Sequence, residues 1–129
     1  MTDHPETTAV LLIAHGSRQE AANDDLRQLT ARLADHRQYP IVEASFLELA
    51  EPDIIAGGDR CVEFGANRVL LVPYFLSAGV HLSRDLTAAR DTLAQRHPDV
   101  DFRLGPALGP DPMLDDLIRK RIAELDTPR

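Results

Sequence analysis

The sequence has little cysteine, and it lacks tryptophan and any long apolar run. Cys61 is the single cysteine among 129 residues, so the chain can form no internal disulfide and no thiolate cluster for zinc. Any metal ion must therefore be held by nitrogen and oxygen ligands. Cys61 itself falls on the apolar side of an expected helix, and we predict a buried thiol without chemistry.

A basic surface is also missing. The formal net charge is -7, which argues against a nucleic-acid partner, because proteins that bind the phosphate backbone carry basic stripes. Residues 1–8 are polar and acidic, without the basic segment or apolar run of a signal peptide or membrane span. We therefore expect a cytoplasmic protein with no membrane partner, and one domain over residues 1–129.

Four short runs rich in strand-forming residues alternate with four helical patterns. The expected strands cover residues 9–14, 41–48, 68–73 and 100–104. Strict alternation predicts an α/β fold, in which a four-stranded parallel sheet carries helices on both faces. The first and third runs are almost wholly apolar, which places them at the centre, and a flavodoxin-like order of 2-1-3-4 leaves the last strand at an edge.

The expected helices have recognisable start and stop signals. We predict that a capping box of Ser17 and Glu20 opens the first helix. The second helix should begin with Pro52 at its first position and end at Gly65. We expect the third over Leu86 to His97, and we expect Asp111 and Pro112 to open the fourth. In the fourth helix, apolar residues from Leu114 to Leu125 line one face.

Two histidines and a carboxylate follow the strands at one edge of this sheet. His15 follows the first strand, Glu48 ends the second, and His81 lies in the loop 74–81 after the third. Ligands in open parallel sheets bind outside the carboxyl ends of the strands. We therefore expect His15 and His81 to face each other across a crevice, with Glu48 beside them.

Each of these residues also has a simpler interpretation. His15 could hydrogen-bond a backbone carbonyl, His81 could be a surface loop residue, and Glu48 could be a solvated charge. Ser17 is first of all a helix cap, and Arg18 a surface residue of the first turn, although either could meet a substrate carboxylate at the helix N-terminus. The shared edge favours the functional interpretation of the two histidines.

The residues at these positions resemble the short class II chelatases of cobalamin and sirohaem biosynthesis, CbiX and SirB. The similarity covers nearly the whole chain. It rests on the segments LLIAHGSR (11–18), VEASFLELAEP (42–52) and VPYFLSAGVH (72–81), followed by Asp85, and on GPALGPDP (105–112). Three such motifs in order are stronger evidence than any one of them.

The resemblance implies a chelatase that inserts cobalt or iron into sirohydrochlorin and works as a homodimer. It implies His15, His81 and Glu48 as the functional residues, binding the metal and carrying out catalysis. We assign substrate contacts to Ser17, Arg18, Ser77 and Arg84. No cofactor is expected beyond the substrate metal ion, which could be Co²⁺, Fe²⁺ or Ni²⁺, since imidazole and carboxylate ligands admit all three.

The chemistry of the three residues suits this reaction. Metal insertion exchanges two pyrrole N–H protons for one M²⁺, so the site needs a loose metal ligand and a base, and neutral imidazole can be both. A non-catalytic carrier of metal or tetrapyrrole would use the same residues. A histidine phosphatase also places a histidine before glycine, but Ala14 stands where that family has the arginine that holds the phosphoryl group.

Overall fold

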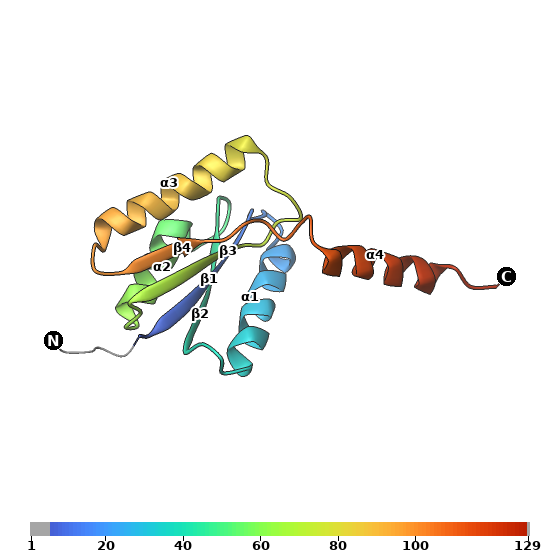
Figure 1. Ribbon diagram of the computed structural model, residues 1–129, viewed down its shortest axis with the longest axis horizontal. Helices are drawn as coiled ribbons and strands as arrows, with labels where there is room; N and C mark the ends of the chain where they lie inside the picture. The colour runs from blue at the N-terminus through green and yellow to red at the C-terminus, as the bar shows by residue number, and fades with distance from the viewer. Residues whose placement is uncertain (1–5, 129) are drawn as a thin grey trace.

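A computed structural model describes residues 6–128 of the chain (Figure 1). Its elements, in order, are β1 (Thr8–Ala14), α1 (Glu20–Asp35), β2 (Ile41–Phe46), α2 (Ile54–Glu63), β3 (Arg68–Pro73), α3 (Val80–Arg96), β4 (Asp101–Leu104) and α4 (Pro112–Leu125). The strands form one parallel sheet in the order β2-β1-β3-β4. The predicted fold class and strand order are confirmed, whereas the prediction for residues 1–8 lies partly outside the described residues.

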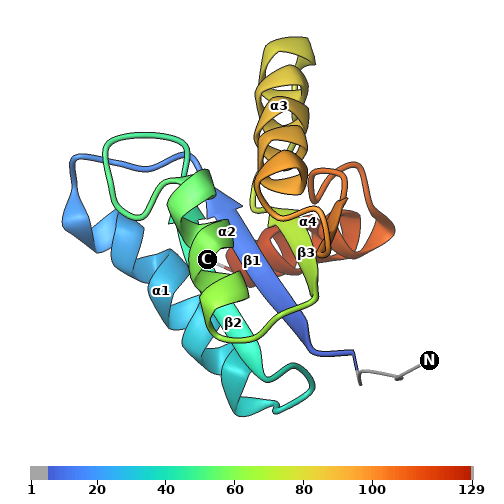
Figure 2. The same cartoon turned by 90° about the vertical axis from the view of Figure 1, so that its left-hand side faces the viewer.

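The two central strands separate two apolar layers. On one face, Leu11 of β1 packs in a cluster with Cys61 of α2 and Leu93 of α3. On the other face, Leu12 of β1 packs in a second cluster with Leu26 of α1. Figure 2 shows α1 and α3 on either side of the strands. Alternate residues of β1 therefore serve opposite layers, as a strand buried on both faces requires.

Cys61 is fully buried among apolar side chains. Burial raises the pKa of its thiol to about 12, because a thiolate is poorly solvated in an apolar core. The thiol is therefore protonated at neutral pH, and the predicted burial of Cys61 is confirmed.

The starts of the first two helices differ from the prediction. Helix α1 begins at Glu20 after Gln19, and Ser17 does not cap it: the Ser17 hydroxyl accepts a hydrogen bond from the Gln19 N–H at 3.0 Å, so the predicted capping box is wrong. Likewise, Pro52 is not the first residue of α2. The cap there is Asp53, whose carboxylate accepts from the Ala56 N–H at 2.8 Å. In both cases a short polar side chain forms a local hydrogen bond, and the residue types that mark helix starts did not predict it.

Helix α3 begins earlier than predicted, and this moves His81. The helix starts at Val80, so His81 lies in its first turn and not in a loop. The Gly79 carbonyl accepts a hydrogen bond from the Ser83 N–H at 3.0 Å, and Leu82 packs against the core. These two interactions stabilise a first turn whose sequence carries no capping side chain.

The far end of α3 is tied to α2 by charged groups. Arg96 and His97 both contact Asp59, with the Arg96 Nη2 and Asp59 Oδ2 atoms 2.5 Å apart and the His97 Nε2 and Asp59 Oδ1 atoms 2.7 Å apart. The hydrogen bond from Arg96 and the contact with His97 lower the pKa of Asp59, because both favour the ionised carboxylate. This contact ties the C-terminal end of α3 to α2.

Helix α4 has the predicted cap but stands apart from the sheet. The Asp111 carboxylate accepts from the Met113 N–H at 2.9 Å, and Pro112 occupies the first turn. None of the residues of α4 is buried, and Figure 1 shows the helix as an arm directed away from the other elements. Among residues 6–128, no helix combines the length and apolar character needed to cross a membrane.

Candidate functional site

His15 and Glu48 meet where two neighbouring parallel strands end. His15 directly follows β1, and Glu48 follows β2, which ends at Phe46. The His15 Nε2 and Glu48 Oε1 atoms are 3.2 Å apart. The backbones are joined as well, because the Glu48 N–H donates to the His15 carbonyl at 3.2 Å and the Leu47 N–H donates to the Ala14 carbonyl at 3.0 Å. The sheet register therefore continues past the strand ends and holds the two side chains together.

Gly16 permits this close approach of the two loops. Its φ angle is +94°, in the region that disfavours L side chains. A Cβ atom placed on Gly16 would lie 1.8 Å from the backbone oxygen of Glu48, well inside contact distance. Any side chain at position 16 would therefore push the Glu48 loop away from His15.

Replacing Gly16 by alanine is expected to lower the free energy of unfolding by at least about 2 kcal/mol, because it adds the clash with Glu48 to the backbone strain. Gly65→Ala is the matched control: Gly65 also has a positive φ, +106°, but nothing lies within 4 Å of its added Cβ. Urea denaturation of both variants measures the difference. A loss in Gly16→Ala no larger than in Gly65→Ala would contradict the proposed contact.

The histidine and the glutamate lie at a cavity of about 400 Å³ between the loop after β2, the start of α2 and one face of α3. Its lining residues are His15, Leu47, Glu48, Asp53, Ile54, Ile55, Asp85 and Ala89. The lining thus combines one imidazole with three carboxylates. Asp53 also caps α2, whereas Asp85 faces the cavity from α3. This concentration of negative charge favours the approach of a cation.

Asp85 was assigned no role from the sequence, although its spacing of four residues from His81 indicates that the two share one side of a helix. His81, Asp85 and Ala89 are separated by four residues each, so they lie in one row along α3. Asp85 and Ala89 line the cavity, which places exposed His81 one turn beyond its mouth. Had α3 been predicted to begin at Val80, this spacing would have pointed to Asp85.

The structure brings together two of the three predicted metal ligands. Within residues 6–128, no three histidine, cysteine, aspartate or glutamate side chains form a group that could hold a metal ion. His15 and Glu48 are adjacent, whereas His81 is on α3 and is not among the residues that line their cavity. His81 therefore stays a predicted ligand that lies outside the lining of this cavity.

The geometry of the His15 and Glu48 pair suits a shared cation. Nitrogen and oxygen ligands bind a divalent metal at about 2.1 Å, so two of them at an angle of about 100° are separated by about 3.2 Å. The observed distance is 3.2 Å, and the side chains are 65% and 59% exposed, respectively. A metal ion could therefore reach both atoms from solvent without rearrangement of the loops.

Ser17 and Arg18 lie in the loop between β1 and α1. The Asn23 side chain clamps this loop, since its Oδ1 accepts from the Ser17 N–H at 2.9 Å and its Nδ2 donates to the Ser17 carbonyl at 2.8 Å. Arg18 is exposed beside His15 in the sequence. Neither residue is among those that line the cavity, and the Ser17 hydroxyl is already bonded to the Gln19 N–H.

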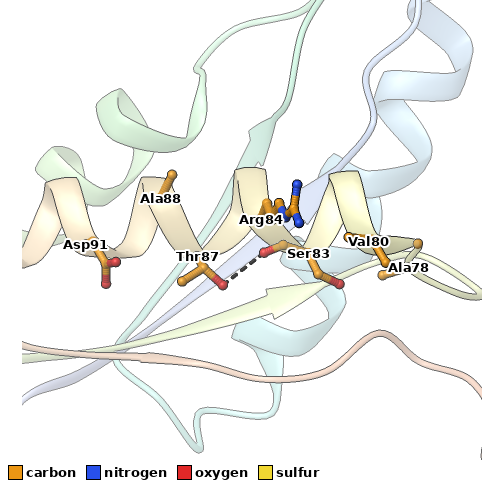
Figure 3. Close-up of a pocket in the computed structure, with 8 residues that line it drawn as sticks. Ala78, Val80, Ser83, Arg84, Thr87, Ala88 and Asp91 are labelled. Atoms are coloured by element: carbon orange, nitrogen blue, oxygen red, sulfur yellow. Dashed lines mark hydrogen bonds between the residues drawn. The ribbon is translucent and has the colours of Figure 1, made fainter.

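Ser77 and Arg84 lie on the other side of the edge. Ser77 is exposed in the loop that leads to α3. Arg84 lines a separate surface hollow of about 550 Å³ together with Val80, Ser83 and Thr87 (Figure 3), where the Thr87 hydroxyl donates to the Ser83 carbonyl at 2.9 Å. The four predicted substrate contacts therefore surround the carboxyl edge and do not share one cavity.

Comparison with known proteins places this chain in a defined group. The family model described as CbiX matches residues 9–125. Two curated relatives from Priestia megaterium are a sirohydrochlorin cobaltochelatase, 34% identical over 92% of this chain, and a sirohydrochlorin ferrochelatase, 34% identical over 90%. The chain spans only 39% and 44% of the length of these two relatives.

Solved structures with similar folds agree. SirB from Bacillus subtilis with Fe³⁺ has a TM-score of 0.85 and 30% identity, covering 95% of this chain and 48% of that one. A cobalamin (vitamin B12) biosynthesis CbiX protein from Marinobacter aquaeolei VT8 has a TM-score of 0.78 and 29% identity, covering 91% of this chain and 95% of that one. The match thus extends over almost the whole described fold.

Proposed function

The chain belongs to the CbiX family, and from that premise we propose that it inserts a divalent metal ion, Co²⁺ or Fe²⁺, into sirohydrochlorin. The observation that carries this proposal is the 3.2 Å pair of His15 Nε2 and Glu48 Oε1 at the mouth of an acidic cavity. A site with few protein ligands and open positions can hand a metal ion over, whereas a closed structural site retains it.

The reaction can be followed through these side chains. The substrate metal ion binds between His15 and Glu48, with water in its remaining positions. As the macrocycle approaches, its nitrogens replace the water and then the protein ligands. Two pyrrole N–H protons leave as one M²⁺ enters, and His15 and Glu48, released from the metal, are the nearest groups that can accept them. Asp85 across the cavity offers a further acceptor.

The remaining predicted residues receive roles at the edge of this site. His81 stays in the proposal as a third functional residue, because it lies on the same side of α3 as Asp85 and Ala89, which line the cavity. Arg18 and Arg84 are exposed cations on either side of the edge, and Ser17 and Ser77 lie in the loops beside them. We assign these four to the carboxylate groups of the tetrapyrrole, whose negative charge the acidic chain would otherwise repel.

We also propose that two copies of the chain work together. The curated relatives above are more than twice as long as the segment that matches them, so they have room for a second unit of this size. A chain whose described residues form one sheet, with this acidic cavity at its edge, could obtain that second unit from another copy, through the symmetric pairing that is common among small oligomers.

An assay of turnover distinguishes the chelatase from a carrier that uses the same residues. Purified protein, sirohydrochlorin and Co²⁺ are combined under anaerobic conditions with the substrates in large excess. We expect many equivalents of metallated product per chain, measured from the absorption spectrum of the macrocycle. Formation of one equivalent or less would contradict catalysis and favour the carrier, and initial rates with Co²⁺, Fe²⁺ and Ni²⁺ would rank the metals.

A further inference from the structure

Leu49, the residue after Glu48, adopts a backbone conformation that leucine seldom takes. Its φ angle is +63°, in the left-handed region, where a Cβ atom crowds the backbone and where glycine or asparagine is usually found. Among the described residues other than glycine, only Arg37 shares a positive φ angle. Backbone strain of this kind is concentrated at functional sites, so its position directly after a proposed metal ligand points to a role for Leu49.

The residues on both sides of Leu49 hold it in this conformation. Leu47 packs against the apolar cluster between the sheet and helices α2 and α3, whereas Ala50 packs against the cluster on the opposite face, under α1. The Phe46 N–H donates to the Pro52 carbonyl at 2.9 Å and so closes the loop that contains them. With both flanks fixed, the chain has to turn at Leu49, and the packing on either side balances the strain.

The side chain of Leu49 itself gains little from the fold, because it is 53% exposed. The two residues before it, Leu47 and Glu48, line the acidic cavity, and the two after it, Ala50 and Glu51, line a second hollow of about 510 Å³. Leu49 is not among the residues that line either one, so it lies on the rim between them. Glycine or asparagine would suit the backbone better, and a polar side chain would suit the solvent better. Neither the fold nor hydration therefore explains an isobutyl group at this position.

We propose that Leu49 contacts the flat face of the tetrapyrrole that is turned toward the metal held by His15 and Glu48. The inference rests on the proposed chelatase reaction and adds to it the residue that recognises the ring system. The conjugated ring is largely apolar, whereas its carboxylates lie at the periphery, where cations can bind them. An apolar side chain on the rim can pack on the ring and leave both metal ligands free, which holds the pyrrole nitrogens over the metal ion.

Binding of sirohydrochlorin to the metal-free protein tests this contact without turnover. Leu49→Asn removes the apolar contact and introduces a residue that suits a positive φ angle, and we expect the dissociation constant to rise at least about tenfold. Leu49→Met keeps an apolar side chain of similar volume, so its dissociation constant should stay within about threefold of that of the unaltered chain. The absorption spectrum of the macrocycle, followed during titration, gives the three constants.

Arg37→Asn is the matched control for the backbone. The two replaced residues have φ angles of +63° and +55°, but Arg37 lies between α1 and β2, at the amino end of the strand, away from the site. The urea midpoint should fall in neither asparagine variant, because asparagine adopts this conformation more readily. Arg37→Asn should bind sirohydrochlorin as the unaltered chain does, and Co²⁺ titration without the tetrapyrrole should give the same affinity in both variants.

Three results would overturn the contact. The first is normal binding of sirohydrochlorin by Leu49→Asn. The second is a fall in its Co²⁺ affinity and urea midpoint together with its tetrapyrrole affinity, which would show that Leu49 only supports the loop. The third is a smaller mass of Leu49→Asn by light scattering, which would show that a second copy covers the side chain.

Failure of the proposed reaction is distinguished from failure of this contact. If the unaltered chain binds sirohydrochlorin without turnover, the reaction is contradicted, while the comparison of Leu49→Asn with Leu49→Met still decides the contact. If the unaltered chain does not bind sirohydrochlorin at all, both proposals are overturned.

Discussion

Replacing His15 by alanine is expected to lower the rate of metal insertion at least about 10²-fold, the usual contribution of a positioned acid–base group. The side chain is 65% exposed, so its loss should change the free energy of unfolding by less than about 0.5 kcal/mol. Initial rates with sirohydrochlorin and Co²⁺, together with urea denaturation, measure the two effects. The substitution removes both the ligand and the proton acceptor while the Glu48 loop stays in place.

His97→Ala is the control for removing an imidazole elsewhere. His97 contacts Asp59 at the far end of α3, with the His97 Nε2 and Asp59 Oδ1 atoms 2.7 Å apart, so its loss should lower stability and leave the rate unchanged. Free imidazole added to His15→Ala should restore part of the rate. A His15→Ala enzyme that turns over normally would remove the proposed site, even with the family membership unchanged.

Much of the fold could be predicted because it follows from apolar runs and helical patterns that are local and recur along the chain. The apolar runs at 9–14 and 68–73 became the central strands β1 and β3, and the mixed run at the end became the edge strand β4. The meeting of His15 and Glu48 followed from the same logic, since the carboxyl ends of neighbouring parallel strands share one edge. Hydrophobic patterning and topology are sufficient for these features.

The features that the sequence did not predict depend on contacts between distant segments or on competing local bonds. The Ser17 hydroxyl bonds to Gln19 and not to the helix, and the first turn of α3 is stabilised by the packing of Leu82. The role of Gly16 comes from its contact with the backbone of Glu48, a segment distant in the sequence. The apolar face of α4 was visible in the sequence, but its separation from the sheet was not, because the connection before it, in which the Leu108 N–H donates to the Phe75 carbonyl, sets its direction.

Glu48→Gln is expected to lower the rate of metal insertion about thirtyfold, whereas Glu43→Gln should leave it nearly unchanged. The glutamine keeps the size of the side chain and a hydrogen-bonding oxygen, but it removes the charge that holds a cation and accepts a proton. Strand β2 ends at Phe46, two residues before the predicted end, so Glu48 is free of the alternation of the strand and lies against His15. Glu43 lies inside β2, on the face that carries α2 near Cys61.

The pair is informative because both substitutions change the net charge by the same amount, so any general effect of charge on substrate attraction appears in both. Metal binding by itself gives a second measurement: Co²⁺ titration without the tetrapyrrole should show weaker binding in Glu48→Gln and unaltered binding in Glu43→Gln. Loss of rate without loss of Co²⁺ affinity would assign Glu48 to proton transfer alone. Impaired turnover in Glu43→Gln with normal turnover in Glu48→Gln would contradict the proposed site. The functional carboxylate would then come from within strand β2, and the loop after β2 would serve only to hold Gly16 and His15 in place.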